Sequence, residues 1–218
     1  MTFSLVGRCV RTGMFGAAVT TSSIAVGSRC PYVRAGVGAV LTQHRTDPRL
    51  GPLGLDLLER GFAAQHTLDA IIAATPHRGW RQLAVIDREG RTGAFSGDRV
   101  KPERGDAHGR DCVAIANIVV SAEVPGAMVS AFENDPSAHL AARLLAALEA
   151  GDHAGGEFKP LVSAALLVAA RESFPYIDLR VDRHGAPIDA LARLWHEYEP
   201  IADPYVARAV DPDSAEAL

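Results

Sequence analysis

Short runs of branched and small apolar residues, separated by glycine, fill the first third of the chain. This pattern is typical of strands rather than helices. It predicts a strand before a turn-like break at 11–13, and further strands over 15–21, 24–27 and 35–42. Glycine inside a strand costs conformational entropy, so these glycines indicate that another sheet or a substrate approaches the backbone closely.

The hydrophobic period then changes to three and four residues, which is typical of helices with one buried face. The first of these helices has Leu55, Leu58 and Phe62 on its inner face, and the second has Leu68, Ile71 and Ile72. From this point the pattern predicts, in order, helices 54–60 and 67–74, a hairpin of strands 82–87 and 92–96, a buried strand 113–120, helices 125–133 and 138–150, strands 164–169 and 177–181, and a last helix 187–198.

The predicted helices come in pairs between blocks of antiparallel strands, not singly between parallel strands. This order argues against a doubly wound sheet and favours an α+β layered sandwich with helices on its outer faces. A chain of 218 residues is long enough to bury a full hydrophobic core. We therefore expect one domain over 1–200. Residues 201–218 are rich in Asp, Ala and Pro, and we expect them to form a loosely held tail.

Composition and charge narrow the class of protein. Apolar residues make up 48% of the chain and charged residues 22%, which argues against disorder and coiled coil. A net charge of −4 gives no electrostatic reason to expect a nucleic-acid partner. The longest near-continuous apolar run, 164–170, is too short to cross a bilayer, and no targeting pattern is visible. These features predict a soluble, cytoplasmic protein with no membrane partner.

Familiar signatures of catalytic and metal sites are absent from the sequence. There is no GxSxG, HExxH, Walker or GxGxxG pattern, and no two of the eight histidines have metal-ligand spacing. The three cysteines, Cys9, Cys30 and Cys112, form no CxxC pair, so neither a disulfide framework nor a cysteine zinc site is indicated. We therefore expect no metal and no cofactor.

The N-terminus carries the one candidate for chemistry. Initiator methionine is normally removed when the second residue is small, as Thr2 is. Removal of Met1 would leave a threonine whose hydroxyl lies beside its own α-amine. Because an α-amine has a pKa of about 7.7–8.0, part of it is neutral at working pH and can accept the hydroxyl proton. The alternative is that this chain, like many others, begins with Met-Thr and has no such role.

Several segments together resemble a known family. They are Gly16–Val19, Ala25–Gly27, 35–43, 51–55, 81–87, 95–97, 116–117, 151–156 and 178–182. As a set they resemble the bacterial family filed as domain of unknown function 1028, which is grouped with the Ntn (N-terminal nucleophile) hydrolases. The resemblance covers about residues 2–195. It implies a four-layer αββα sandwich with Thr2 as a nucleophile that attacks an amide or related C–N bond.

Asn117 occupies the position of the family's Gly-Asn and is the candidate side-chain donor to an oxyanion. The alternative is an asparagine that satisfies backbone groups at a strand end. Ser22, next to Ser23, stands where the family often has lysine, and both serines are candidates to hydrogen-bond substrate. Arg34 and Gln43 border a glycine-rich strand, where each either faces a pocket or is an ordinary strand-end polar residue.

Two functions follow from these features. The first is an Ntn-type amidohydrolase that acts on a small-molecule amide or peptide-like substrate. The second is a non-catalytic binding or assembly module of the same fold, because Ser22 brings no positive charge near Thr2 and Ala116 replaces the family's glycine. Ntn-type folds often associate through their helix layers, so a homodimer is a further expectation.

Overall fold

The computed structural model describes residues 1–215 and contains two antiparallel sheets. The larger sheet has six strands in the order β10-β9-β2-β1-β8-β7, which are Ile177–Val181, Ser163–Ala169, Phe15–Thr21, Thr2–Arg8, Cys112–Asn117 and Arg104–Gly109. The smaller sheet has four strands in the order β3-β4-β5-β6, which are Pro31–Arg34, Gly38–His44, Arg81–Asp87 and Thr92–Ser96.

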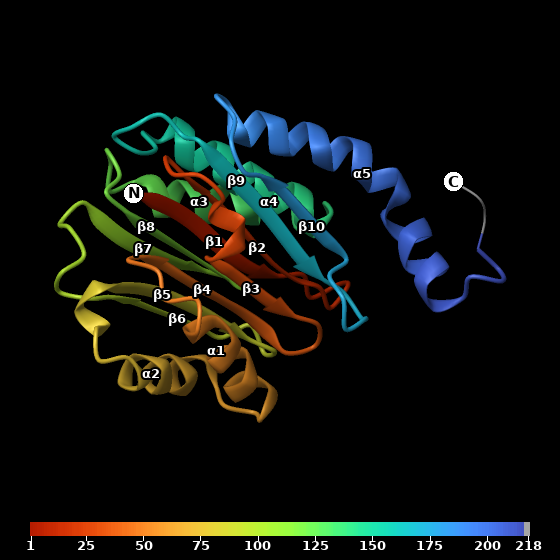
Figure 1. Ribbon diagram of the computed structural model, residues 1–218, viewed down its shortest axis with the longest axis horizontal. Helices are drawn as coiled ribbons and strands as arrows, with labels where there is room; N and C mark the ends of the chain where they lie inside the picture. Colours follow the sequence, from red (N-terminus) through yellow and green to blue (C-terminus); the bar gives the residue numbers. More distant parts are fainter. Residues whose placement is uncertain (216–218) are drawn as a thin grey trace.

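Helices cover the outer face of each sheet (Figure 1). Those over the larger sheet are α3 (Val124–Asn134), α4 (Leu140–His153) and α5 (Pro187–Val210). Those over the smaller sheet are α1 (Leu50–Glu59) and α2 (Ala64–Ala74). The predicted four-layer αββα sandwich is therefore confirmed.

Alternating side chains of β1 separate two hydrophobic clusters. Phe3 and Leu5 pack into the cluster under α3 and α4, whereas Val6 belongs to the cluster between the two sheets. Because successive side chains of a strand point to opposite faces, Thr2 and Ser4 share the inter-sheet face with Val6. The fold thus turns the first side chain of β1 toward the second sheet.

Three predictions in the strand regions are wrong. Residues 24–27 do not form a strand: Ala25 is left-handed (φ 53°) and precedes the short 3₁₀ turn η1 (Val26–Ser28). The strand predicted over 35–42 begins only at Gly38, and the unpredicted β3 precedes it. The third error is the omission of β7, whose sequence RGDAHG lacks branched and aromatic residues. A polar strand of this kind forms because it lies at the edge of the sheet and pairs with β8 along its whole length.

The C-terminal helix is longer than predicted. It was expected to end at residue 198, but α5 continues to Val210 through Pro200 and Pro204. Proline removes one helical hydrogen bond and bends a helix, and α5 changes direction along its length in Figure 1. Residues 201–210, expected in a loosely held tail, are therefore helical, and Ala202 is fully buried. The last part of that tail, 216–218, lies outside the described residues.

Candidate active site at the N-terminus

Thr2 lies at the N-terminal end of β1, between the ends of two neighbouring strands. In the β1–β8 register it stands directly opposite Asn117. On its other side the hydroxyl of Thr21, the last residue of β2, is 3.4 Å from the Thr2 hydroxyl. Directly opposed residues of an antiparallel pair have Cβ atoms about 5 Å apart on one face. Thr2 is 6% exposed, so the sheet places its hydroxyl in a mostly enclosed, polar position.

The carbonyl oxygen of Met1 accepts hydrogen bonds from the hydroxyls of both Thr2 and Thr21. The Thr21 bond measures 2.7 Å. With Met1 in place the Thr2 nitrogen is an amide and cannot act as a base. This carbonyl belongs to the Met1–Thr2 peptide bond, so it lies beside the two hydroxyls only while Met1 is present.

Hydrogen bonds between side chains fix Asn117 in a chain that we call the amide network. Its members are Ser4, Gln43, Gln82, Ser96 and Asn117. Asn117 Nδ2 donates to Gln82 Oε1 (2.9 Å), and Gln43 Nε2 donates to the same oxygen (2.7 Å). Ser4 Oγ donates to Gln43 Oε1 (2.7 Å), and Gln82 Nε2 donates to Ser96 Oγ (2.9 Å). Among residues 1–215, Asn117 Oδ1 is buried without a hydrogen-bond partner. The network holds the side chain of Asn117 in one orientation, in which Nδ2 donates one of its two hydrogens to Gln82 and the unpartnered atom, Oδ1, is an acceptor.

Glu157 brings a buried carboxylate to the same end of β1. It follows α4 in the chain, and its backbone bridges to Val119, just beyond β8. Its Oε2 accepts a hydrogen bond from the Ser22 N–H (2.9 Å), while Oε1 has no partner within the described chain. Burial raises the pKa of Glu157, opposed by the Ser22 bonds and by the positive N-terminus.

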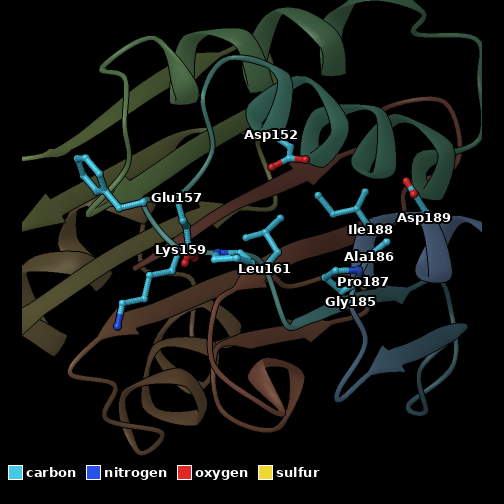
Figure 2. Close-up of a pocket in the computed structure, with 11 residues that line it drawn as sticks. Asp152, Glu157, Lys159, Leu161, Gly185, Ala186, Pro187, Ile188 and Asp189 are labelled. Atoms are coloured by element: carbon cyan, nitrogen blue, oxygen red, sulfur yellow. The ribbon is translucent and has the colours of Figure 1, made fainter.

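A cavity of about 460 Å³, here called the N-terminal cavity, opens beside Met1. It is lined by Met1, Lys101, Glu103, Ile118, Phe158 and Lys159. Burial lowers the pKa of the Met1 α-amine, the charge of Glu157 raises it, and Lys101 and Lys159 lower it further. Figure 2 shows Glu157 and Lys159 on the loop that also borders a second cavity, of about 390 Å³, with Lys159 extending away from Asp152 and Asp189.

Comparisons with known proteins identify the family. The model of the family of unknown function DUF1028 matches residues 2–191. The chain belongs to the DUF1028 family. A solved DUF1028 protein, SPO2555 from Silicibacter pomeroyi, is 31% identical, with a TM-score of 0.84 over 90% of this chain and 85% of that chain. Anbu (ancestral beta-subunit) from Yersinia bercovieri is 11% identical, with a TM-score of 0.39 over 94% of this chain and 96% of that chain. A comparison with the curated proteins gives no match.

In this DUF1028 protein the structure brings Thr2, Asn117 and Ser22 together. The Ser22 backbone binds Glu157, and the Ser22 hydroxyl lies 3.8 Å from the Met1 sulfur. Gln43 is also close, but it is fully buried within the amide network and does not line the N-terminal cavity. Its side chain therefore supports the site from between the sheets.

The structure places the other two candidates elsewhere. Ser23 is exposed, and its hydroxyl accepts a hydrogen bond from Arg29 (2.7 Å). Arg34 forms ion pairs with Asp56 (2.9 Å) and Glu59 (2.8 Å) of α1. It stands opposite Gly38, at the other end of β4 from Gln43. The guanidinium of Arg34 is thus paired with α1 on the outer face of the smaller sheet, and Arg34 is not part of the site.

Thr21, Gln82 and Glu157 were not predicted from the sequence as residues of the site. Gln82 carried a usable signal, because an amide inside an otherwise apolar strand must be hydrogen-bonded if that strand is buried. Thr21 and Glu157 carried no such signal: their positions beside Thr2 depend on strand pairing and on a loop far along the chain.

Residues 1–215 contain no group of three or more His, Cys, Asp and Glu side chains that could hold a metal ion. No helix within the same residues has the length and apolar character needed to cross a membrane.

Proposed function

We propose that this protein is an Ntn-type amidohydrolase, in which Thr2 becomes the N-terminal nucleophile after removal of Met1. The observation that carries the proposal is the position of the Thr2 hydroxyl, at the first residue of β1 and between Thr21 and Asn117. Membership of a family does not by itself assign an activity, so the proposal rests on this geometry.

The reaction follows from the groups at the site. Thr2 Oγ attacks the carbonyl carbon of the substrate amide, and its proton passes to the Thr2 α-amine. The negative charge that forms on the carbonyl oxygen is stabilised by hydrogen-bond donors, for which Asn117 Nδ2 is our candidate. The C–N bond then breaks, and the leaving amine takes the proton. Water hydrolyses the resulting Thr2 ester and releases the acid.

Thr21 and Glu157 have supporting roles in this proposal. When Met1 leaves, the Thr21 hydroxyl loses the carbonyl oxygen that it binds and becomes available to the substrate carbonyl. Glu157 fixes the segment that follows Thr21, because its Oε2 accepts a hydrogen bond from the Ser22 N–H. Its second oxygen, Oε1, has no hydrogen-bond partner within residues 1–215.

The test uses processed protein and a panel of N-acyl p-nitroanilides, with release of the coloured amine as the readout. Thr2→Ala should lower the rate of amide hydrolysis by about 10³-fold or more, because the oxygen that attacks the substrate is lost. Thr2→Ser should retain measurable activity. Thr12→Ala, which changes a threonine in the turn at the far end of β1, is the matched control and should behave as wild type. Equal hydrolysis by wild type and Thr2→Ala would contradict the proposal.

The second candidate function is a binding module that never uses Thr2. It is favoured by Ser22, which brings no positive charge near Thr2. In this case the native protein keeps Met1, and none of the Thr2 variants changes the rate of amide hydrolysis.

A further inference from the structure

The two lysines of this chain both line the N-terminal cavity. The sequence has 22 basic residues, and only Lys101 and Lys159 are lysines, the others being arginines. Lys101 lies in the segment between β6 and β7, and Lys159 lies in the loop between α4 and β9. The fold brings both to the cavity that contains Met1.

Both ammonium groups are available to a ligand. The two lysines are exposed, and neither forms an ion pair or side-chain hydrogen bond with another described residue. Their charges reach the N-terminus, since both lower the pKa of the Met1 amine. An unpaired cation at a cavity attracts a small anion, and lysine does so as a mobile point charge.

The acidic residues at the cavity do not cancel this charge. Glu103 is the one carboxylate among the residues that line it. Glu157 is not among the lining residues; its carboxylate is buried and accepts a hydrogen bond from the Ser22 N–H, and burial raises its pKa. The cavity thus presents two ammonium groups against one exposed carboxylate.

The remaining lining of the cavity suits a hydrocarbon chain. Ile118 lines it, and Phe158 does so with 56% of its surface exposed. A volume of about 460 Å³ lies within the range of small-molecule sites, about 300–1,000 Å³. Apolar walls with a few charged groups are typical of sites that orient a small ligand by its charge.

We propose that the N-terminal cavity binds an amide substrate that carries a carboxylate, which Lys101 and Lys159 hold while Phe158 and Ile118 contact its hydrocarbon part. The cleavage of the amide rests on the proposed function of Thr2, whereas binding of the carboxylate does not. The inference names the substrate class as acidic amides, such as N-acyl derivatives of acidic amino acids.

The test measures binding of two probes by titration calorimetry at low salt. N-acetylglutamate carries two carboxylates, and its diamide has the same shape without charge. We expect N-acetylglutamate to bind at least about tenfold more tightly than the diamide, and this preference to weaken as salt is raised. Each of Lys101→Gln and Lys159→Gln should lower the affinity for N-acetylglutamate by about fivefold and leave the affinity for the diamide unchanged.

A matched control removes the same charge elsewhere. Arg60→Gln with Arg193→Gln takes two exposed cations from other surfaces and should leave both affinities unchanged. The variant that combines Lys101→Gln with Lys159→Gln is compared with this control. The inference is overturned if the two probes bind with equal affinity or if the combined lysine variant binds them as the arginine control does. It is also overturned if N-acetylglutamate shows no binding at about 10 mM. The effects of salt and of the lysine variants on binding do not depend on the Thr2 hydroxyl, so they should also appear in a Thr2→Ala background, where no hydrolysis takes place. A failure of catalysis by Thr2 is thereby separated from a failure of this inference.

Discussion

At the scale of single residues, Glu157 has surroundings that differ from those of an ordinary surface carboxylate. It is 9% exposed, and one of its oxygens has no partner within residues 1–215. Burial raises its pKa above the ordinary value of 4.5. The folded protein therefore holds the proton to a higher pH than the unfolded chain does, and stability falls as pH rises between these two pKa values.

Glu157→Gln removes this titration and keeps a side-chain oxygen for the Ser22 N–H. We expect the free energy of unfolding of the variant, relative to wild type, to increase as pH rises above 4.5 and to be constant below it. Urea unfolding at a series of pH values measures this difference. Glu197→Gln, at an exposed position on α5, is the control and should show no such trend. A pH-independent difference for Glu157→Gln would show that the carboxylate titrates normally.

At the scale of elements, the amide network ties the two sheets together behind the site. Gln82 of β5 accepts hydrogen bonds from Gln43 of β4 and Asn117 of β8, and it donates to the carbonyl oxygen of Ala116 (2.8 Å). Buried polar groups destabilise a fold when they lose their partners, so the network is stable only when complete. The position of Asn117 beside Thr2 thus depends on a residue in the opposite sheet.

Gln82→Met keeps the size of the side chain but leaves the amides of Gln43 and Asn117 without their shared acceptor. Each unsatisfied buried group costs about 1–3 kcal/mol, so we expect the free energy of unfolding to fall by about 2–4 kcal/mol. Urea denaturation measures the loss. Gln65→Met, at an exposed position on α2, should change stability by less than about 0.5 kcal/mol. If the two variants lost similar amounts of unfolding free energy, the amide network would contribute nothing to the stability of the fold.

At the scale of the whole molecule, the order of elements was largely predictable because hydrophobic periodicity is a local signal. Ile177–Val181 was predicted with the bounds that the structure shows, and the paired helices led to the correct layers. Local signals fail where tertiary context decides. Phe62 was assigned to an inner helix face but lies beyond the end of α1 and is 46% exposed. The polar strand β7 forms only because β8 offers it an edge.

The site was predictable in part for the same reason. Thr2 and Asn117 were found from the chain itself and from family resemblance, and their strands place them opposite each other. Thr21, Gln82 and Glu157 meet them through pairings between distant segments, which no local pattern encodes. Arg34 shows the converse, because a strand-end arginine gives no indication that α1 supplies its two acidic partners.

The proposed mechanism requires that Met1 is removed and that Thr2 then acts as a nucleophile. The most direct measurement is the intact mass of protein purified from its own host, before and after treatment with a small β-lactone that acylates reactive hydroxyls. The account predicts a native mass that lacks Met1 and a single acyl adduct, which peptide mapping places on Thr2. A native mass that retains Met1, with no adduct formed, would contradict it.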